Sequence, residues 1–223
     1  MQPQADPFIV PVCDEEIEIL YQDPHLLLIN KPTGLLTLSG KHPLNKDSVH
    51  YRLTQKFPTA KLPHRLDFGT SGILIVALSD EVNAHICQQF KARTIEKTYT
   101  VVLYGHLQDE NFCVEIPITK DKLNFPLQKV CYESGKKAIT HYQVIERYQE
   151  PCATRVLLKP VSGRTHQLRI HSREIGHPIL GCDLYATDDA FFMAQRLMLH
   201  ATSIDFDHPV TGHRVNGLSP CPF

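Results

Sequence analysis

A short apolar run directly after a charged turn is the feature that most limits how this chain can fold. Residues 63–79 read P-H-R-L-D-F-G-T-S-G-I-L-I-V-A-L-S, and residues 73–78 within them are apolar, mostly branched and bounded by turn residues. Such a short run is typical of a buried β-strand, because helices are usually longer. The stretch therefore predicts a buried strand that begins close to Asp67, a charged side chain that needs a partner at that place.

Two interpretations of Asp67 follow from its neighbours. Arg65 stands two positions earlier, so an isolated R-x-D pattern favours a structural ion pair between these two residues that closes the turn. The alternative is a functional carboxylate, presented on a tight turn that Gly69 and Gly72 make possible.

The other segments predict an α+β fold. Branched or alternating runs predict strands at residues 18–21, 26–30, 96–105, 136–147, 153–159 and 196–206, with two or three short strands within 111–133. Helix caps and apolar periodicity predict helices at 48–57, 79–92 and 163–176, whereas the tail after residue 209 is rich in turn residues. Because strands outnumber helices and short turns join them, we expect a mixed, mainly antiparallel β-sheet core with flanking helices and loops.

Length and composition limit the class of protein. The chain has 223 residues, 42% of them hydrophobic, which is enough for one compact domain. Residues 1–16 are polar and contain prolines, so we expect an N-terminal arm followed by a single domain at 17–223. No apolar run has the length of a membrane span, and the seven cysteines are scattered without a C-x-x-C pair. We therefore expect a cytoplasmic monomer with no metal site, no membrane contact and no obligatory protein partner.

Net charge gives no general sign of a nucleic-acid partner, because the formal net charge is −1. Any RNA-binding surface must therefore be local. Between residues 159 and 178 the only acid is Glu174, and the basic residues there are Lys159, Arg164, Arg169 and Arg173. This basic segment is the predicted place of contact with RNA phosphates.

Four segments of the sequence resemble motifs of the RluA family of pseudouridine synthases. H-R-L-D-F-G-T-S-G at residues 64–72 resembles the family signature H-R-L-D-x-x-T-S-G, and N-K-P-T-G-L at 30–35 resembles the first motif. K-T-Y-T-V at 97–101 resembles the second motif, and G-R-T-H-Q-L-R-I-H at 163–171 the third. The resemblance covers about residues 18–206 and is strongest to the short members of the family, which modify ribosomal and transfer RNA.

This resemblance implies an isomerase with the pseudouridine synthase fold and a catalytic cleft across its sheet. The substrate would be specific uridines in structured RNA, in 23S ribosomal RNA and in the anticodon stem-loop of transfer RNA. Asp67 would attack or deprotonate the ribose, Tyr99 would stack on the flipped base and take its C5 proton, and Arg169 would pair with Asp67. Because the isomerisation involves no net redox change, no cofactor is expected.

The resemblance also implies further contacts with the substrate or its loops, made by Lys31, His64, Arg65, Arg164, His166, Leu168 and Ile170. Lys31 could meet a phosphate or a carboxylate, support the catalytic loop, or be an exposed turn lysine. Arg164 and His166 would hold their loop or touch phosphate. Leu168 or Ile170 would pack near the uracil.

Other classes of protein remain possible at this stage. A non-catalytic RNA-binding module or RNA chaperone would use the basic segment 159–178 without needing Asp67. A serine hydrolase would need G-x-S-x-G, and a zinc deaminase would need H-x-E with P-C-x-x-C, and neither pattern occurs. Many relatives carry an extra N-terminal RNA-binding domain, which we do not expect here because only some sixteen residues precede the first strand.

Overall fold

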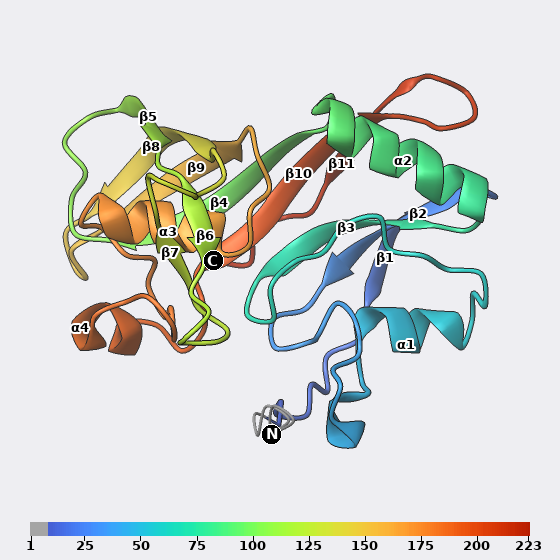
Figure 1. The fold of residues 1–223 in the computed structure, drawn as a ribbon, viewed down its shortest axis with the longest axis horizontal. Helices are drawn as coiled ribbons and strands as arrows, with labels where there is room; N and C mark the ends of the chain where they lie inside the picture. Colours follow the sequence, from blue (N-terminus) through green and yellow to red (C-terminus); the bar gives the residue numbers. More distant parts are fainter. Residues whose placement is uncertain (1–8) are drawn as a thin grey trace. The chain divides into compact units, whose positions relative to one another are not determined.

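The computed structural model describes residues 9–223 and divides them into two compact units (Figure 1). The first unit contains the chain up to Ile95 together with Ile204–Pro220, and the second contains Glu96–Ser203 and Cys221–Phe223. Residues 1–8 of the predicted N-terminal arm lie outside the described residues. Asp67 therefore belongs to the first unit, whereas Tyr99 and Arg169 belong to the second.

The sheet of the first unit begins with three antiparallel strands in the order β1 (Glu18–Gln22), β2 (Leu26–Lys31) and β3 (Ser71–Ala77). β2 pairs with β3 along its whole length, from Leu26 opposite Ala77 to Lys31 opposite Gly72. Every residue of β3 is buried, so the buried strand predicted from the apolar run is confirmed. β10 (Leu199–Asp207) follows β3 in the strand order, and β11 (Arg214–Leu218) pairs with β10.

The helices of the first unit begin where the sequence signals place them. A short 3₁₀ helix, η1 (Pro43–Asn45), precedes α1 (Val49–Thr54), and α2 (Asp80–Ala92) follows β3 and packs against it (Figure 1). The hydroxyl of Ser48 accepts a hydrogen bond from the N–H of Tyr51 at 3.1 Å, and Ser79 accepts one from Val82 at 3.3 Å. Both serines are N-caps, which satisfy backbone donors that the first helical turn leaves free.

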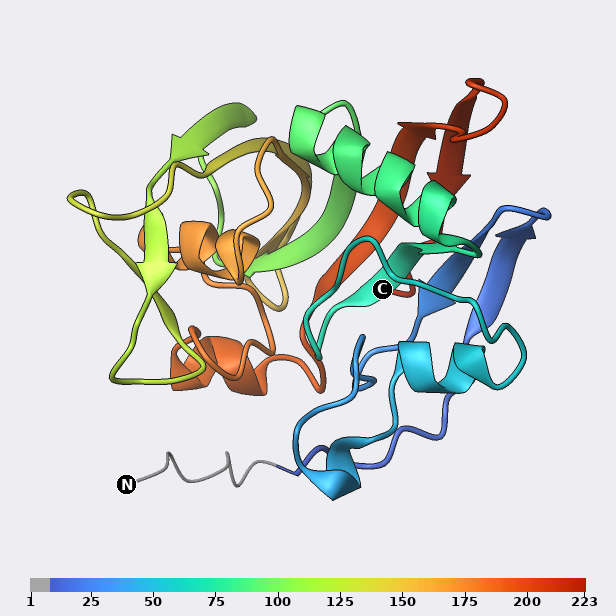
Figure 2. The same ribbon diagram turned by 45° about the vertical axis from the view of Figure 1, so that its right-hand side comes forward.

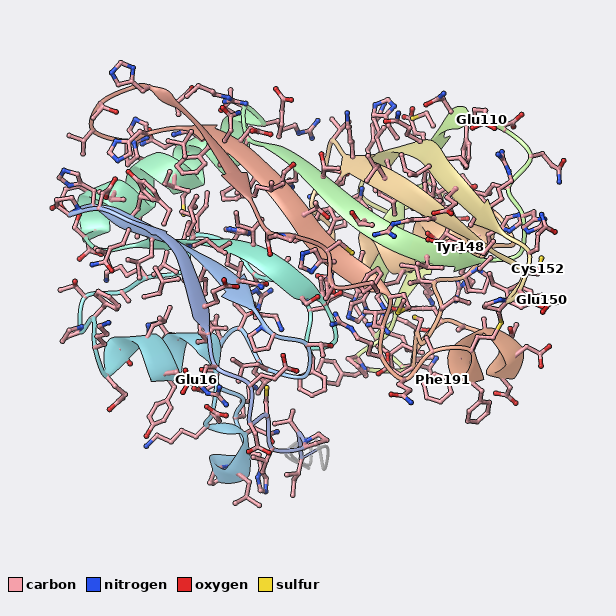
Figure 3. The ribbon with its side chains drawn as sticks, turned by 180° about the vertical axis from the view of Figure 1, so that it is seen from behind. Glu16, Glu110, Tyr148, Glu150, Cys152 and Phe191 are labelled. Atoms are coloured by element: carbon pink, nitrogen blue, oxygen red, sulfur yellow. The ribbon has the colours of Figure 1, made fainter. Side chains whose placement is uncertain are left out.

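The main sheet of the second unit has the strand order β10-β4-β9-β8-β5. Its further strands are β4 (Glu96–Tyr104), β5 (Asn111–Glu115), β8 (Ile139–Tyr148) and β9 (Ala153–Pro160). The pairs β4–β9, β8–β9 and β5–β8 are antiparallel, with Tyr148 opposite Ala153 where β8 turns into β9. Figure 3 labels Tyr148, Glu150 and Cys152 at this turn, which the Glu150-Pro151 dipeptide predicts.

A smaller layer covers one face of this sheet. β6 (Ile118–Lys120) and β7 (Gln128–Val130) form a two-stranded antiparallel sheet of their own, and β7 packs against α3 (Gln167–Glu174) (Figure 1). The chain then forms a short helix, α4 (Asp188–Phe192). Side chains of β4, β8, β9 and α3 fill the core of the unit, among them Val101, Tyr142, Leu158, Leu168 and Ile170.

The mixed, mainly antiparallel sheet predicted from the sequence is confirmed, and three local differences have physical reasons. α3 is shorter than the helix predicted at 163–176, because His166 before it adopts a left-handed backbone conformation with φ of 55°. α4 was not predicted, since five residues carry no readable period. β11 was not predicted either, because Gly217 lies inside it; a Cβ at Gly217 would lie 2.8 Å from a methyl carbon of Ile73.

Within residues 9–223, each helix is too short or too polar to cross a bilayer.

Candidate active site

Asp67 lies on the loop that enters β3, half-buried between the buried side chains of Leu66 and Thr70. Its backbone carbonyl accepts a hydrogen bond of 3.1 Å from the N–H of Thr70, which closes the turn through Phe68 and Gly69. The turn leads directly into β3, which is buried along its whole length. The carboxylate is thus presented from a fixed backbone, as a catalytic group requires.

The end of β2 and the residues after it, 31–37, hold the Asp67 loop from the other side. The backbone groups of the loop are occupied on both sides of Asp67. The hydrogen bonds are Gly34 N–H to Phe68 O (3.0 Å), Thr33 Oγ1 to Gly69 O (2.8 Å), Thr37 Oγ1 to Leu66 O (2.6 Å) and Lys31 Nζ to Phe68 O (3.2 Å). Together these four hydrogen bonds restrict the backbone conformation of the loop at Asp67.

Lys31 is fully buried, which decides among the roles that the sequence left open. Its ammonium group donates to the carbonyl oxygens of Pro32 at 2.8 Å, Leu35 at 2.7 Å and Phe68 at 3.2 Å. An ammonium group enclosed in this way does not reach a substrate phosphate, and it is no exposed turn lysine. These contacts favour support of the Asp67 loop for Lys31, and its full burial does not fit the expected contact with substrate.

The two residues that open the H-R-L-D string have different surroundings. Nε2 of His64 accepts a hydrogen bond of 3.0 Å from the N–H of Ile75, and the ring packs on Phe90 at 4.8 Å between centroids. His64 therefore fastens the loop to β3 and α2. Arg65 is exposed and makes no hydrogen bond or ion pair within residues 9–223, so the structural Arg65–Asp67 pair is not formed.

Tyr99 lies on β4 in the second unit, opposite Leu158 of β9, and is half-buried against the core cluster that contains Leu168. Lys97, two residues earlier on the same strand, has its side chain on the same face. Burial lowers the pKa of Lys97. Sequence reasoning did not select Lys97, although the K-x-Y spacing places both side chains on one face.

Arg169 lies on α3 and is only 4% exposed. Its Nε donates to the sulfur of Cys182 at 3.2 Å, and its guanidinium group forms an ion pair with the carboxylate of Asp183. The guanidinium carbon lies 5.3 Å from the ring centroid of Tyr185, within the range of a cation–π contact. A buried arginine held on several sides keeps a fixed direction, which suits a cation that must serve a carboxylate.

Tyr185 is a central residue of this site that the sequence analysis missed. Its hydroxyl oxygen accepts a hydrogen bond of 2.9 Å from the backbone N–H of Gln128 in β7 and lies 2.7 Å from Nδ1 of His166. The same ring faces a second guanidinium group, that of Arg173, at 5.4 Å. Its position in G-C-D-L-Y gives no sign of these contacts, because the residues that it joins are distant in sequence.

The remaining residues of the third motif mostly hold α3 in place. Arg164 donates from Nε to the carbonyl of Lys137 at 3.2 Å, and Nδ1 of His166 lies 2.7 Å from the hydroxyl of Tyr185. These contacts favour a loop-holding role for both residues, and their contact with phosphate stays a prediction. Leu168, at 7% exposure, borders the cluster that packs against Tyr99. Ile170 is fully buried, which does not fit a direct contact with uracil.

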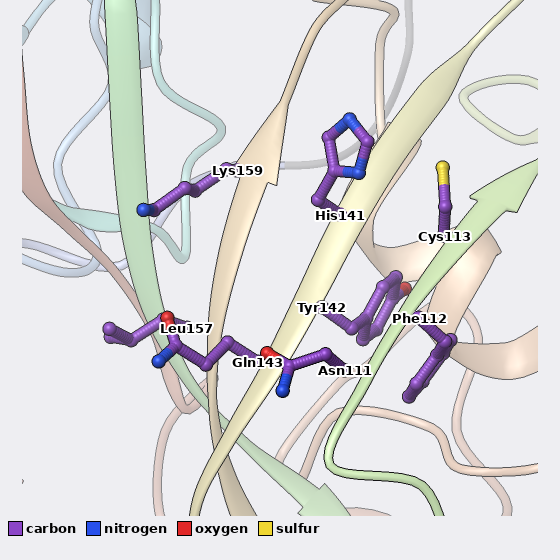
Figure 4. A pocket seen from close by; sticks show the side chains of 8 residues that line it. All are labelled: Asn111, Phe112, Cys113, His141, Tyr142, Gln143, Leu157 and Lys159. Carbon is purple, nitrogen blue, oxygen red and sulfur yellow. The ribbon is translucent and has the colours of Figure 1, made fainter.

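The basic segment 159–178 does not form one exposed surface. Directly paired residues of adjacent strands point to the same face. Tyr99, Leu158 and Tyr142 are such partners, and they share the face that carries α3, since the Tyr142 hydroxyl lies 3.2 Å from that of Ser172. Lys159 follows Leu158 and points to the opposite face. There it lines an open groove of about 410 Å³ together with His141 and Gln143, among others (Figure 4).

Residues 9–223 contain no group of three or more His, Cys, Asp or Glu side chains arranged to hold a metal ion.

Comparison with known proteins shows which class of enzyme carries these site elements. The chain belongs to the RNA pseudouridylate synthase family, whose sequence profile matches residues 25–174. The match includes Lys31, Asp67, Tyr99 and Arg169. The predicted isomerase class is thereby confirmed, and the comparisons give no support to a non-catalytic RNA-binding module.

Individual relatives match most of the chain. The dual-specificity RNA pseudouridine synthase RluA of Yersinia pestis is 47% identical over 194 residues, which cover 87% of this chain and 94% of the relative. The protein of the same name from Escherichia coli strain K12 is 42% identical over 221 residues, covering 99% and 97%.

Solved structures agree with the fold. Human RNA pseudouridylate synthase domain containing 1 matches with a TM-score of 0.80 at 30% identity, covering 96% of this chain and 86% of that one. Human RNA pseudouridylate synthase domain containing 4 matches with a TM-score of 0.73 at 23% identity, covering 92% and 88%, and supports the fold alone.

Proposed function

We propose that this chain converts specific uridines in structured RNA to pseudouridine, with Asp67 as the catalytic carboxylate. The observation that carries the proposal is the H-R-L-D-F-G-T-S-G turn. It presents Asp67 half-buried on the loop before β3, and hydrogen bonds from Lys31, Thr33 and Thr37 hold that loop. A structural role for Asp67 in an ion pair with Arg65 has no support, because Arg65 pairs with no described residue.

The reaction needs a carboxylate at the ribose. The bond between N1 of uracil and C1′ of ribose breaks, the base rotates, and a bond forms between C5 and C1′. C5 then loses its proton and N1 gains one, so atoms and electrons balance without an oxidant. Asp67 serves either as the nucleophile at C1′ or as the base that deprotonates the ribose. Because the reaction is redox-neutral, the enzyme needs no organic redox cofactor.

Tyr99 and Arg169 supply the rest of the chemistry in this proposal. Tyr99 stacks on the uracil once the base has left its stack, and its hydroxyl takes the proton from C5. Its half-buried position on β4 leaves part of the side chain for such a contact. Arg169 pairs with Asp67 and keeps it ionised during the reaction. The burial of Arg169 and its contacts with Asp183 and Tyr185 support a fixed cation in this role.

The other predicted substrate contacts divide into two groups. Arg65 is exposed two residues before Asp67, so its guanidinium group is free to bind the RNA backbone near the reacting nucleotide. Leu168 packs beside the uracil, next to Tyr99. Lys31, His64 and Ile170 act through the loops and the core that they hold, without touching the RNA.

The proposed substrates are 23S ribosomal RNA and the anticodon stem-loop of transfer RNA. The proposed working form is a cytoplasmic monomer that acts without a metal ion or a protein partner. Two relatives are named dual-specificity enzymes, which supports more than one RNA target for this chain.

Mapping of pseudouridine in total RNA tests this function. RNA from cells that lack the protein is compared with RNA from the same cells that carry the wild-type gene on a plasmid. We expect specific pseudouridines in ribosomal or transfer RNA to disappear in the deletion and return with the plasmid. Identical maps in both cells would contradict the proposal.

A further inference from the structure

The β6–β7 hairpin and the turn after it, residues 118–137, form a projecting element that we call the basic arm. Figures 1 and 2 show its loop at a distance from the main sheet of the second unit. Three of its large apolar side chains are mostly exposed: Leu123 at 91%, Phe125 at 78% and Tyr132 at 77%. Exposed apolar side chains that gather in one segment mark surfaces that bind a partner.

Positive charge accompanies these side chains. The basic arm contains five lysines and two acids, in a chain whose formal net charge is −1. The lysines are Lys120, Lys122, Lys129, Lys136 and Lys137. Of these, Lys129 and Lys137 make ion pairs, with Asp121 at 3.7 Å and Glu115 at 2.5 Å, while Lys120, Lys122 and Lys136 make none within residues 9–223.

Hydrogen bonds among residues 121–127 hold the tip of the arm, while Phe125 within it stays mostly exposed. The N–H of Asp121 donates to Leu127 O at 3.0 Å, and the N–H of Leu127 donates to Asn124 O at 2.7 Å. The side-chain amide of Asn124 donates to the carboxylate of Asp121 at 2.9 Å, and this bond is the main reason why the pKa of Asp121 lies below its usual range. A tip ordered in this way loses little entropy when it binds.

The base of the arm is joined to the proposed active site within the same unit. The N–H of Gln128 in β7 donates to the hydroxyl of Tyr185, and the ring of Tyr185 faces the guanidinium group of Arg169 at 5.3 Å. β7 also packs against α3, which carries Arg169. An RNA that places a uridine near Arg169 would therefore have its flanking nucleotides near the arm.

We propose that the basic arm binds the RNA substrate beside the target uridine. Its lysines contact phosphates, and Phe125 and Tyr132 stack on unpaired bases. The inference rests on the proposed function and names a second contact surface for the same substrate. Aromatic side chains interleaved with lysines suit a flexible strand, since every base has a stacking face and every nucleotide a phosphate. A second copy of this chain fits less well, because two such arms would bring lysines together.

The experiment compares Phe125→Ala and Tyr132→Ala with Phe192→Ala, a control side chain that is 80% exposed on α4. The probe is ribosomal RNA with tritium at C5 of uridine, prepared from cells that lack the protein. We expect each arm variant to raise KM and the dissociation constant by about tenfold, which is typical for loss of one stacked base. The kcat value and the melting temperature should stay unchanged, because neither ring touches the reacting atoms or the core. Phe192→Ala should match wild type throughout.

Charge is tested with Lys122→Gln and Lys136→Gln, with the exposed Lys91→Gln on α2 as control. Each arm variant should reduce the slope of log affinity against log salt by about one, as expected for one lost phosphate contact.

Unchanged affinities and slopes in all arm variants, with active wild-type enzyme, would overturn the inference and leave the proposed function standing. A concentration-dependent dimer that Phe125→Ala abolishes would assign the arm to a second copy. Wild-type protein that binds RNA through the arm but releases no tritium would contradict the proposed function and support the arm.

Discussion

The ammonium group of Lys31 donates a hydrogen bond of 3.2 Å to the carbonyl oxygen of Phe68, the residue that follows Asp67. The same group donates to two carbonyls of its own loop, those of Pro32 and Leu35. A fully buried cation thus connects the end of β2 with the loop that carries Asp67. Lys31 therefore contributes to holding the backbone next to Asp67.

Lys31→Met should therefore destabilise the protein, because the buried carbonyl oxygens of Pro32 and Leu35 lose the ammonium donor and that of Phe68 keeps only the N–H of Gly34. We expect the free energy of unfolding to fall by about 3 kcal/mol or more, since each buried unsatisfied group costs on the order of 1–3 kcal/mol. Urea denaturation measures this change. Lys91→Met, at an exposed position on α2, is the control and should leave the midpoint nearly unchanged. Equal midpoints for both variants would show that the Lys31 contacts do not stabilise the loop.

Tyr99→Phe separates stacking from proton transfer. The variant keeps the aromatic face and loses only the hydroxyl, so RNA binding should stay near the wild-type level while product formation is largely lost. Filter binding and tritium release measure the two properties on the same sample. Tyr51→Phe, on α1, is a matched control and should keep full activity. A fully active Tyr99→Phe enzyme would leave Tyr99 with a packing role only.

Arg169 and Asp183 form an ion pair between a buried and an exposed side chain. The Arg169 side chain is 4% exposed, and that of Asp183 is 63% exposed. Arg169→Met should abolish most activity, because it removes the buried positive charge proposed to stabilise an ionised Asp67. Asp183→Asn should lower kcat with little change in KM or in the free energy of unfolding, because the exposed carboxylate only directs the guanidinium group. Asp109→Asn, an exposed aspartate of the same unit, is the control. A loss of stability in Asp183→Asn that fully accounts for its lower activity would contradict this directing role.

The regular elements could be predicted because their signals are local. Ser79 caps α2, and the apolar run after Gly72 is too short for a helix and too apolar for a surface strand, so both elements follow from neighbouring residues. The catalytic motifs were located by their resemblance to a family, and the comparisons confirm that family.

Long-range polar contacts account for what the sequence did not show. The N-K-P-T-G-L segment does not reveal that three carbonyl oxygens converge on Lys31, so a contact with phosphate remained possible until burial was known. Tyr185 was missed because Gln128 and His166, which its hydroxyl joins, come from other elements. Lys159 lies in a basic segment, yet strand alternation turns it away from Tyr99.

Because His171 is buried, we expect the protein to lose stability in mild acid. Its side chain is buried, Nδ1 lies 3.0 Å from the hydroxyl of Thr140, and Nε2 lies 3.0 Å from the carbonyl of Ile116. Burial holds the pKa of His171 below its ordinary value of 6.5, so between these two values the unfolded chain binds more protons than the folded one. This contribution to stability is fully present above pH 6.5 and decreases as the pH falls toward the folded-state pKa.

Urea denaturation between pH 7.5 and pH 5 measures this dependence. His171→Asn should be less stable at neutral pH and should show a smaller decrease toward pH 5. His213→Asn, at an exposed position, should keep the wild-type decrease. The same decrease in His171→Asn as in wild type would assign the pH dependence to other groups.

Release of tritium from C5-labelled RNA by Asp67→Asn, measured together with RNA binding by filter retention, tests the central claim most directly. The substitution keeps the size of the side chain and removes its negative charge. We expect a folded protein that binds RNA within about tenfold of wild type, or about 1.4 kcal/mol, and forms no detectable pseudouridine. The matched control Asp109→Asn should release tritium at the wild-type rate. Product formation by Asp67→Asn at a rate near that of wild type would contradict the catalytic role of Asp67.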